Sequence, residues 1–333
     1  MTISSPSSLL DIRLQPGRPP MATPVGVHDI RAWAVEHSAA LSAAVVEHGA
    51  LLVRGLGLRD ADDAGDVFRL LASTGLMPDR EAFAPRQTYA PGVYSASKWP
   101  ANQPMCMHHE VSYALEVPGL MLFACLQAPS AGGATCVADG TAVLEALPQE
   151  LVERFEREGW LLTRNYNDEI GASYADAFGT DDRAAVESYC QANAIEYQWL
   201  PDGGLRTRQR RQAVVRHPVT GQRCWFNQIA FLNEWTIAEE IREYLVDVYG
   251  ADGLPFNTSF GGGDPISQDV VDLLNQLYVD QTAREPWESG DLLLVDNVRT
   301  AHSREAFQGA REVVVGMANP VRMPQVSWET AIR

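Results

Sequence analysis

A histidine–glutamate pair constrains this chain more than any other feature of its sequence. His108 and Glu110 stand just before an apolar run that is too short to cross a membrane. In an extended strand, residues i and i+2 point to the same side, so this imidazole and this carboxylate can hold one metal ion together. Two ligands make only part of a metal site, and the others must come from elsewhere in the chain.

The best candidate for a third ligand is His302, near the other end of the chain. It follows a strand-like run at residues 292–295, which would carry it back beside the first strand in a closed sheet. Two histidines and one carboxylate leave about three positions open on an ion, as in non-haem Fe(II) oxygenases. His109 alternates to the opposite face of the strand, so we expect it to pack or to support the ligands.

Further segments give the chain a family resemblance. It is similar to the TauD/TfdA family of Fe(II)- and 2-oxoglutarate-dependent dioxygenases, and it most resembles the clavaminate-synthase-like and SyrP-like amino-acid oxygenases. The matches occur in the family's order over roughly residues 49–319. They are the HxE pair, GGATCVAD at 132–139, RHPVTGQRCWFNQ at 216–228, WESGDLLLVDN at 287–297, and His302 with Arg311.

The resemblance implies an α+β fold built on a double-stranded β-helix, the jelly-roll or cupin-like barrel, with flanking helices. We expect residues 1–25 to form a loosely packed N-terminal tail and residues 26–333 to form a single TauD-like domain. A helical insertion at about residues 167–211 is expected between barrel strands, where it would cover the mouth of the active site.

Hydrophobic periodicity predicts most of the regular elements. Helices are expected at residues 28–48, 60–73, 184–194 and 268–280, and Pro148 should divide residues 141–158 into two short helices. Strands are expected near residues 50–56, 120–127, 135–138, 160–166, 292–295 and 312–318. Residues 77–107 contain five prolines and are predicted to be loop.

The resemblance also implies the roles of individual residues. His108, Glu110 and His302 would bind Fe(II), and dioxygen and 2-oxoglutarate would be co-substrates. Arg311 would bind the distal carboxylate of 2-oxoglutarate, for which a planar guanidinium is well suited. The hydroxyl of Thr135 would help, although a β-branched residue is also common in any strand. Arg304 is a rival for the role of Arg311.

Substrate contacts are the least constrained part of the site. Tyr94 and Ser95 precede the first metal ligand closely enough to line a pocket, although such loops often only cover a domain. Arg304 and Asn227 are further candidates, but a buried amide such as Asn227 often only satisfies backbone groups. His217 lies in a turn and is expected to be structural.

The implied reaction oxidises an unactivated C–H bond of an amino acid or an amino-acid-derived molecule, free or carrier-bound, and releases succinate and carbon dioxide. Hydroxylation in specialised metabolism is favoured, because Glu110 is present where related halogenases have a small residue. Desaturation or ring closure, a taurine- or sulfonate-type catabolic dioxygenase, and a non-catalytic metal-binding barrel are the alternatives. The sequence lacks HExxH, which argues against a zinc hydrolase.

Composition limits the partners and the compartment. The formal net charge of −17 argues against nucleic acid as a partner. The five cysteines form no CxxC pair, and neither a signal-like start nor a run long enough to span a membrane is present. We therefore expect a cytoplasmic enzyme that acts on a small molecule, away from membranes. The oligomeric state cannot be predicted from these features.

Overall fold

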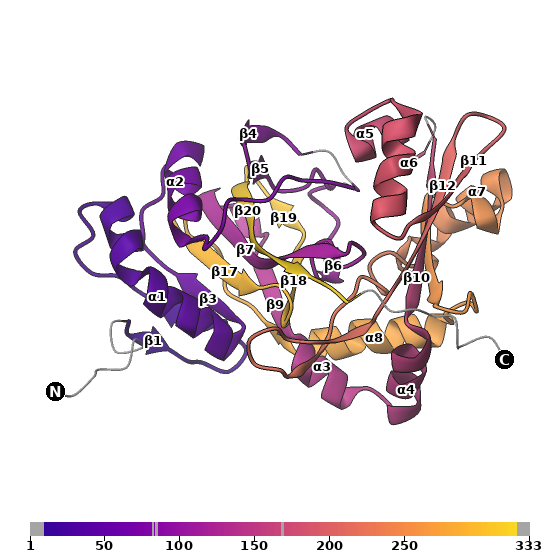
Figure 1. Cartoon of the computed structure of the whole chain (residues 1–333). Coiled ribbons are helices and arrows are strands. Elements are labelled where there is room, and N and C mark those ends of the chain that lie inside the picture. The colour runs from indigo at the N-terminus through magenta and orange to yellow at the C-terminus, as the bar shows by residue number, and fades with distance from the viewer. Residues whose placement is uncertain (1–9, 82, 84–85, 168–169, 325–333) are drawn as a thin grey trace.

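The predicted apolar strands form the centre of an eight-stranded sheet (Figure 1). The computed structural model describes residues 10–324 except 82, 84–85 and 168–169. Strands β3 and β17 are buried on both faces, so their apolar runs do not alternate. In sheet order the strands are β1 (Ile12–Arg13), β2 (Met21–Ala22), β3 (Ala50–Val53), β17 (Leu292–Asp296), β7 (Glu116–Gln127), β20 (Glu312–Arg322), β5 (Val93–Ser95) and β4 (Thr88–Ala90).

A second, four-stranded sheet brings the two ends of the predicted site together. Its order is β16 (Thr282–Ala283), β9 (Thr135–Asp139), β18 (Thr300–Arg304) and β6 (Met105–His108). In the antiparallel pairing of β18 with β6, His302 lies directly opposite His108. Leu52 and Phe123 of the large sheet share a buried cluster with Val137 of β9, so side chains of both sheets pack together.

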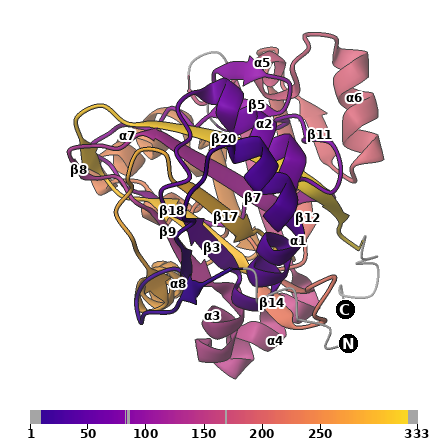
Figure 2. The ribbon, with the colours of Figure 1, turned by 90° about the vertical axis from the view of Figure 1, so that its left-hand side faces the viewer.

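Helices α1 (Ile30–His48) and α2 (Ala61–Leu71) pack on the outer face of the large sheet, where Figure 2 shows them in front of its strands. Leu41 and Phe68 are buried in the core cluster that these helices share with the sheet. Asp29 caps the N-terminus of α1, and Gly49 ends this helix with a φ of 82°. The predicted helices 28–48 and 60–73 are thus present.

The N-terminal segment is more closely attached than we expected. Strand β2 pairs in parallel with β3, and Ala22 is buried at this junction. The description of residues 1–25 as a loosely packed tail therefore does not fit residues 12–22, and residues 1–9 lie outside the described part. The apolar residues in this short segment are too few to show a strand pattern in the sequence.

A third sheet occupies the other side of the molecule (Figure 1). Its order is β11 (Glu196–Trp199), β12 (Leu205–Arg211), β10 (Trp160–Tyr166) and β15 (Phe256–Phe260). Helices α5 (Tyr174–Phe178), α6 (Arg183–Ala192) and α7 (Glu239–Tyr249) and the 3-10 turns η2 (Glu234–Thr236) and η3 (Ala251–Gly253) accompany it. The segment predicted to be a helical insertion therefore supplies two strands as well as two helices.

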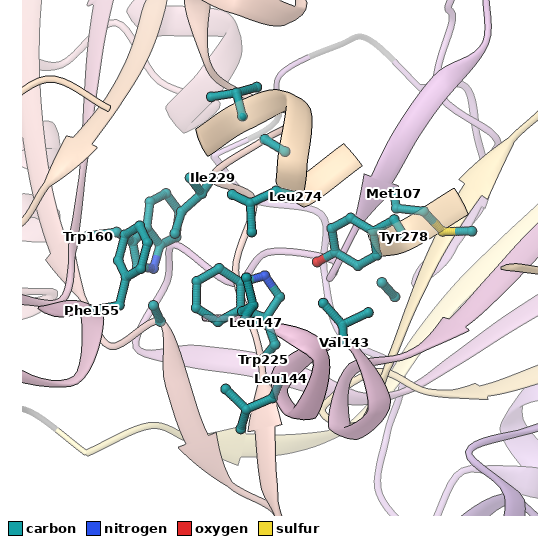
Figure 3. Close-up of a cluster of buried hydrophobic side chains, with 14 of the residues drawn as sticks. Met107, Val143, Leu144, Leu147, Phe155, Trp160, Trp225, Ile229, Leu274 and Tyr278 are labelled. Carbon is teal, nitrogen blue, oxygen red and sulfur yellow. The ribbon is translucent and has the colours of Figure 1, made fainter. Parts of the chain in front are cut away.

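A large aromatic core joins this third sheet to the rest of the molecule (Figure 3). Trp160, Phe155 and Trp225 are fully buried in it and lie close to Leu274. Its helices are α3 (Gly140–Ala146), α4 (Gln149–Glu158) and α8 (Gln268–Asp280), and the break between α3 and α4 falls at Pro148 as predicted. The remaining strands form two short pairs, β13 (Val214–Arg216) with β14 (Arg223–Trp225) and β8 (Ala131–Gly132) with β19 (Phe307–Gln308).

The prediction of a continuous loop at residues 77–107 was wrong. Strands β4, β5 and part of β6 fall within it, and the described prolines of the segment, Pro78, Pro91, Pro100 and Pro104, lie outside these strands. All five cysteines are free. Among the described residues, no helix is both long enough and apolar enough to cross a membrane.

Candidate active site

Three buried side chains converge at the end of strand β6. Donor atoms of His108, Glu110 and His302 all lie within 4.8 Å of one another. The Nε2 atoms of both histidines are 3.4 Å from the same carboxylate oxygen, Oε2 of Glu110. None of the three residues is more than 8% exposed. The structure therefore brings together the three residues that the sequence suggested as metal ligands.

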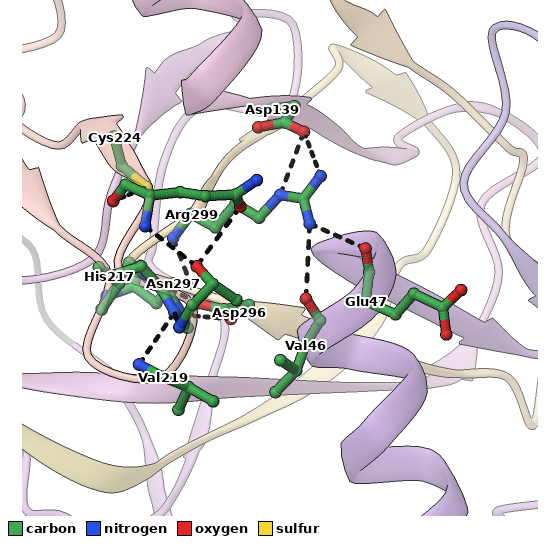
Figure 4. Close-up of polar contacts among 12 residues, drawn as sticks. Val46, Glu47, Asp139, His217, Val219, Cys224, Asp296, Asn297 and Arg299 are labelled. Atoms are coloured by element: carbon green, nitrogen blue, oxygen red, sulfur yellow. Dashed lines mark hydrogen bonds and ion pairs between the residues drawn. The ribbon is translucent and has the colours of Figure 1, made fainter. Parts of the chain in front are cut away.

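The turn between β17 and β18 fixes the backbone of Glu110. The side chain of Asn297 accepts a hydrogen bond from Glu110 N at 2.7 Å and donates one to Glu110 O at 3.0 Å. Its neighbour Asp296 accepts hydrogen bonds from two backbone N–H groups of the same turn and a third, at 2.8 Å, from Nε2 of His217 (Figure 4). His217 thus has a structural role here, and one turn positions Glu110 and leads into the strand of His302.

Arg299, which belongs to the same turn, binds two neighbouring elements (Figure 4). Its guanidinium donates to Asp139 at 2.6 and 3.1 Å, and to the backbone oxygens of Glu47 and Val46 at the end of α1. A cation at a helix C-terminus interacts favourably with the helix dipole. The turn is therefore fastened to both β9 and α1.

The second nitrogen of His108 orients its ring, whereas Nδ1 of His302 has no hydrogen-bond partner among the described residues; both rings have aromatic neighbours. Nδ1 of His108 is 2.8 Å from the backbone oxygen of Cys106, which leaves Nε2 facing Glu110. The ring of Phe231 stacks on His108 at 4.8 Å, and Phe123 lies 5.0 Å from His302. His109 instead directs Nδ1 to the backbone oxygen of Asn297 at 2.7 Å, in keeping with a supporting role.

The pKa values of Glu110 and His302 favour the protonation states that bind a metal cation. Burial alone would raise the pKa of Glu110, but Arg86 and the two histidines hold this pKa well below its usual range. Burial, with a smaller contribution from His108, lowers the pKa of His302 to about 4. At neutral pH the carboxylate is ionised and His302 is neutral, which are the forms that bind metals.

Arg86 is a neighbour of the three donors that the sequence did not reveal. Its Nη2 atom donates to Oε1 of Glu110 at 2.7 Å, so it occupies the carboxylate oxygen that faces away from the histidines. Its Nε atom lies 3.7 Å from Oδ2 of Asp79. Both residues come from the proline-rich segment before β6, where no spacing or periodicity indicates which side chains turn inward.

A small cavity of about 50 Å³ opens on one side of the three donors. Arg311 lines it, donating to Gly133 O at 2.9 Å and to the hydroxyl of Thr135 at 3.3 Å. Burial lowers the pKa of Arg311 to about 10, with a smaller contribution from Arg304, so Arg311 is a cation at neutral pH. A buried cation beside a hydroxyl suits a carboxylate, and we call this cavity the co-substrate compartment.

The two glycines before β9 permit this arrangement. Gly132 and Gly133 have φ values of 66° and 72°, which other residues rarely adopt. A Cβ atom on Gly133 would lie 3.2 Å from Cδ of Arg311, and one on Gly132 would lie 2.2 Å from the backbone oxygen of Ala306. The GGAT motif therefore allows close packing beneath the arginine.

Comparison with known proteins now decides the family. The family described as "Taurine catabolism dioxygenase TauD, TfdA family" matches residues 14–317. The chain belongs to the TauD/TfdA family. It is thus an Fe(II)- and 2-oxoglutarate-dependent dioxygenase, and its donor set of two imidazoles and one carboxylate fits a ferrous ion.

Individual relatives agree with this placement in the TauD/TfdA family. The dapdiamide synthesis protein DdaC of Enterobacter agglomerans is 35% identical over 275 residues, which are 83% of each chain. A clavaminate synthase-like protein of Arabidopsis thaliana is 28% identical over 282 residues, or 81% of this chain and 82% of that one. A structure of PvcB, described as an Fe, alpha-ketoglutarate dependent oxygenase from an isonitrile synthetic pathway, superposes with a TM-score of 0.55 at 18% identity, covering 97% of this chain and 96% of PvcB.

A second cavity of the TauD/TfdA site, about 80 Å³, adjoins two of the donors and shares part of its lining with the co-substrate compartment. His108 and Glu110 line it together with Asp79 and Arg86. Aromatic rings form much of the remaining wall, and we call this cavity the substrate compartment. Two larger hollows have volumes of about 560 and 620 Å³. None of the three donors lines either of them, so they are not part of the site.

Three of the predicted substrate contacts need correction. The hydroxyl of Tyr94 accepts a hydrogen bond from Asp79 N, and that of Ser95 bonds to backbone groups of its own hairpin. The amide of Asn227 donates to Ala213 O and accepts from a nearby backbone N–H. None of the three lines either compartment. Their polar atoms satisfy backbone groups instead, so we no longer expect them to contact a substrate.

The two arginines near the co-substrate compartment differ in their partners. Arg304 lines this compartment, but its guanidinium donates to the backbone oxygens of Trp99, Pro100 and Gln103. It therefore holds the loop before β6, and Arg311 remains the better candidate for a carboxylate. Gln228, the neighbour of Asn227 in the sequence, lines the substrate compartment.

Proposed function

We propose that this dioxygenase hydroxylates an unactivated C–H bond of an amino acid or of an amino-acid-derived small molecule, in specialised metabolism. The observation that carries this proposal is that two small compartments adjoin the donors: all three donors line one of them, and His108 and Glu110 also line the other, whose remaining wall is largely aromatic. The relatives support it, because DdaC is a dapdiamide synthesis protein and PvcB is described as part of a synthetic pathway.

Each side chain has a defined task in this proposal. His108, Glu110 and His302 hold Fe(II), and Arg311 with Thr135 holds the distal carboxylate of 2-oxoglutarate. The ion, when bound, supplies the activation of dioxygen that is coupled to decarboxylation of 2-oxoglutarate to succinate. The protein supplies orientation, and the aromatic rings beside the two histidines keep water away from the reacting C–H bond.

Glu110 favours hydroxylation over halogenation, because its carboxylate occupies the position that a halide would need. Desaturation and ring closure use the same residues and differ only in how the substrate is held, so product analysis separates them from hydroxylation. A sulfonate substrate is tested by including taurine in the same screen.

We also infer that the eight-stranded sheet and the sheet containing β6, β9 and β18 form the two halves of a double-stranded β-helix. The buried cluster that joins Leu52 and Phe123 to Val137 supports this inference, as does the likeness in fold to PvcB. On this view residues 26–333 form one domain, and the segment near residues 167–211 extends it over the substrate compartment.

The test is consumption of 2-oxoglutarate under air with Fe(II), over a set of amino acids and simple derivatives, with mass spectrometry of the products. We expect one equivalent of succinate per hydroxylated product. His302→Ala should abolish both succinate formation and binding of Fe(II) without air, whereas His28→Ala, which changes an exposed histidine, should behave as wild type. Undiminished turnover in His302→Ala would refute the assigned role.

A further inference from the structure

We propose that Asp79 and Arg86 recognise the ammonium and carboxylate groups of a free α-amino acid in the substrate compartment. This inference rests on the proposed function, since it names the substrate class of the same site. It assigns specificity to two residues from a segment in which the sequence showed no motif.

One nitrogen of the Arg86 guanidinium, Nη1, is left for a ligand. Its Nη2 atom is bonded to Glu110 and its Nε atom faces Asp79, but its buried Nη1 atom has no hydrogen-bond partner in the described part of the protein. Leaving a buried N–H group unpaired is unfavourable, so a site for an acceptor is implied. Arg86 borders both compartments, and its free donor is thus beside the three metal-binding side chains.

Asp79 offers the complementary acceptor. Its side chain is 15% exposed, and among the described residues no N–H or O–H group donates a hydrogen bond to its carboxylate. Its charged neighbour is Arg86, whose Nε atom at 3.7 Å is beyond ordinary hydrogen-bond distance. The carboxylate oxygens can therefore accept hydrogen bonds from a ligand cation.

The Asp79 carboxylate and the Arg86 guanidinium are close enough to bind the same small molecule. An α-amino acid carries three N–H donors and two carboxylate acceptors on the same carbon, which is the complement of a neighbouring carboxylate and guanidinium. The rings of Phe83, Phe231 and Phe256 line the same compartment and leave an apolar space for the side chain. The cavity of about 80 Å³ suits a small substrate.

The pair also distinguishes a free substrate from a carrier-bound one. In a carrier thioester the α-carboxylate is replaced by a neutral group, which offers Arg86 no anion. The distal carboxylate of 2-oxoglutarate has a cation of its own in Arg311, which lines the co-substrate compartment and not the substrate compartment. Arg86 is therefore not needed for that carboxylate.

The test measures binding to the full chain loaded with Zn(II), which is redox-inert, and with 2-oxoglutarate. Calorimetry first identifies which of the twenty proteinogenic L-amino acids binds most tightly. That amino acid is then compared with its methyl ester, which lacks the anionic carboxylate, and with its N-acetyl derivative, which lacks the ammonium group. We expect wild type to bind each derivative about tenfold more weakly or worse, because a buried charged partner is left unpaired.

Variants then assign each preference to one residue. Asp79→Asn should lose the preference for the amino acid over its N-acetyl derivative and keep the preference over the ester. Arg86→Met should show the reverse, with Zn(II) content measured first because Arg86 also contacts Glu110. Asp264→Asn, which changes an exposed carboxylate paired with Arg154, should match wild type.

Two results would overturn the inference without any variant having to fold. One is equal binding of the amino acid and either derivative to wild type, and the other is failure of all twenty amino acids to bind. Fe(II)-dependent succinate formation is measured on the same preparations. Its presence without amino-acid binding refutes only this inference, whereas its complete absence refutes the proposed function.

Discussion

At the scale of single residues, Arg311 and Arg304 show that proximity to the site does not define a role. Both line the co-substrate compartment, yet they differ in what their guanidinium groups already bind. Arg304 donates to backbone oxygens of the loop before β6, whereas Arg311 is held side-on by Gly133 and Thr135. Three backbone oxygens already accept hydrogen bonds from the terminal nitrogens of Arg304, whereas Nη1 of Arg311 makes no hydrogen bond within the described residues, so we favour Arg311 for an incoming carboxylate.

Replacement of Arg311 by glutamine should therefore raise the KM for 2-oxoglutarate by roughly 10- to 150-fold, since hydrogen bonds to charged groups contribute about 1.5–3 kcal/mol. Steady-state consumption of 2-oxoglutarate is the measurement. The matched variant Arg304→Gln should leave this KM nearly unchanged and lower the melting temperature, because it releases a loop. Similar increases in KM for both variants would contradict the assignment.

At the scale of elements, the segment that carries Asp79 and Arg86 is fastened to the third sheet. Glu81 is 1% exposed and has a φ of 54°, unusual for a residue other than glycine. Its carboxylate accepts hydrogen bonds from Tyr189 of α6 and Gln209 of β12, both at 2.7 Å. The insertion thus contacts the segment that lines the substrate compartment and helps to position it.

Glu81→Gln should destabilise the protein by about 1–3 kcal/mol, because the new amide places a donor where two donors already converge. Urea unfolding measures this loss. The KM for the amino-acid substrate should rise as the segment loosens, while the KM for 2-oxoglutarate should not, because Arg311 is held by Gly133 and Thr135 rather than by this segment. Glu196→Gln, at an exposed position of β11, is the control. A change in both KM values would argue against a local effect.

The same segment shows where prediction from sequence ends. Long elements such as α1 and β17 were predictable because their apolar residues repeat over many positions or run unbroken. Strands β4 and β5 have three residues each, which is too short for a pattern. The contact of Arg86 with Glu110 depends on how the chain folds back, and no spacing encodes it. The neighbourhood of Thr135 and Arg311 was predictable only through the family resemblance.

At the scale of the whole molecule, the site depends on elements from several layers. His108 and His302 come from the smaller sheet that contains β6 and β18, Phe123 comes from the large sheet, and Phe231 follows β14. A ligand that binds only this assembled state stabilises the entire fold, by about 2.7 kcal/mol at a concentration 100 times its Kd. Metal binding, protonation and unfolding are consequently linked.

The metal-free protein should lose stability as the pH falls from about 6.5 towards 4. Burial lowers the pKa of His302 to about 4 and that of His109 to about 3, whereas both titrate near 6.5 when unfolded. Between these values the unfolded chain binds more protons, so the free energy of unfolding falls with falling pH. Urea unfolding at pH 7 and pH 5 measures the difference.

Zn(II) should raise the free energy of unfolding more at pH 7 than at pH 5, because protons compete with the metal for the same donors. His302→Ala removes one of the buried rings, so its stability should depend less on pH over this interval and respond little to Zn(II). If the wild-type protein were equally stable at pH 5 and pH 7 without metal, the histidines would have to be charged or exposed in the folded state. The three donors could not then face one ion as the structure places them.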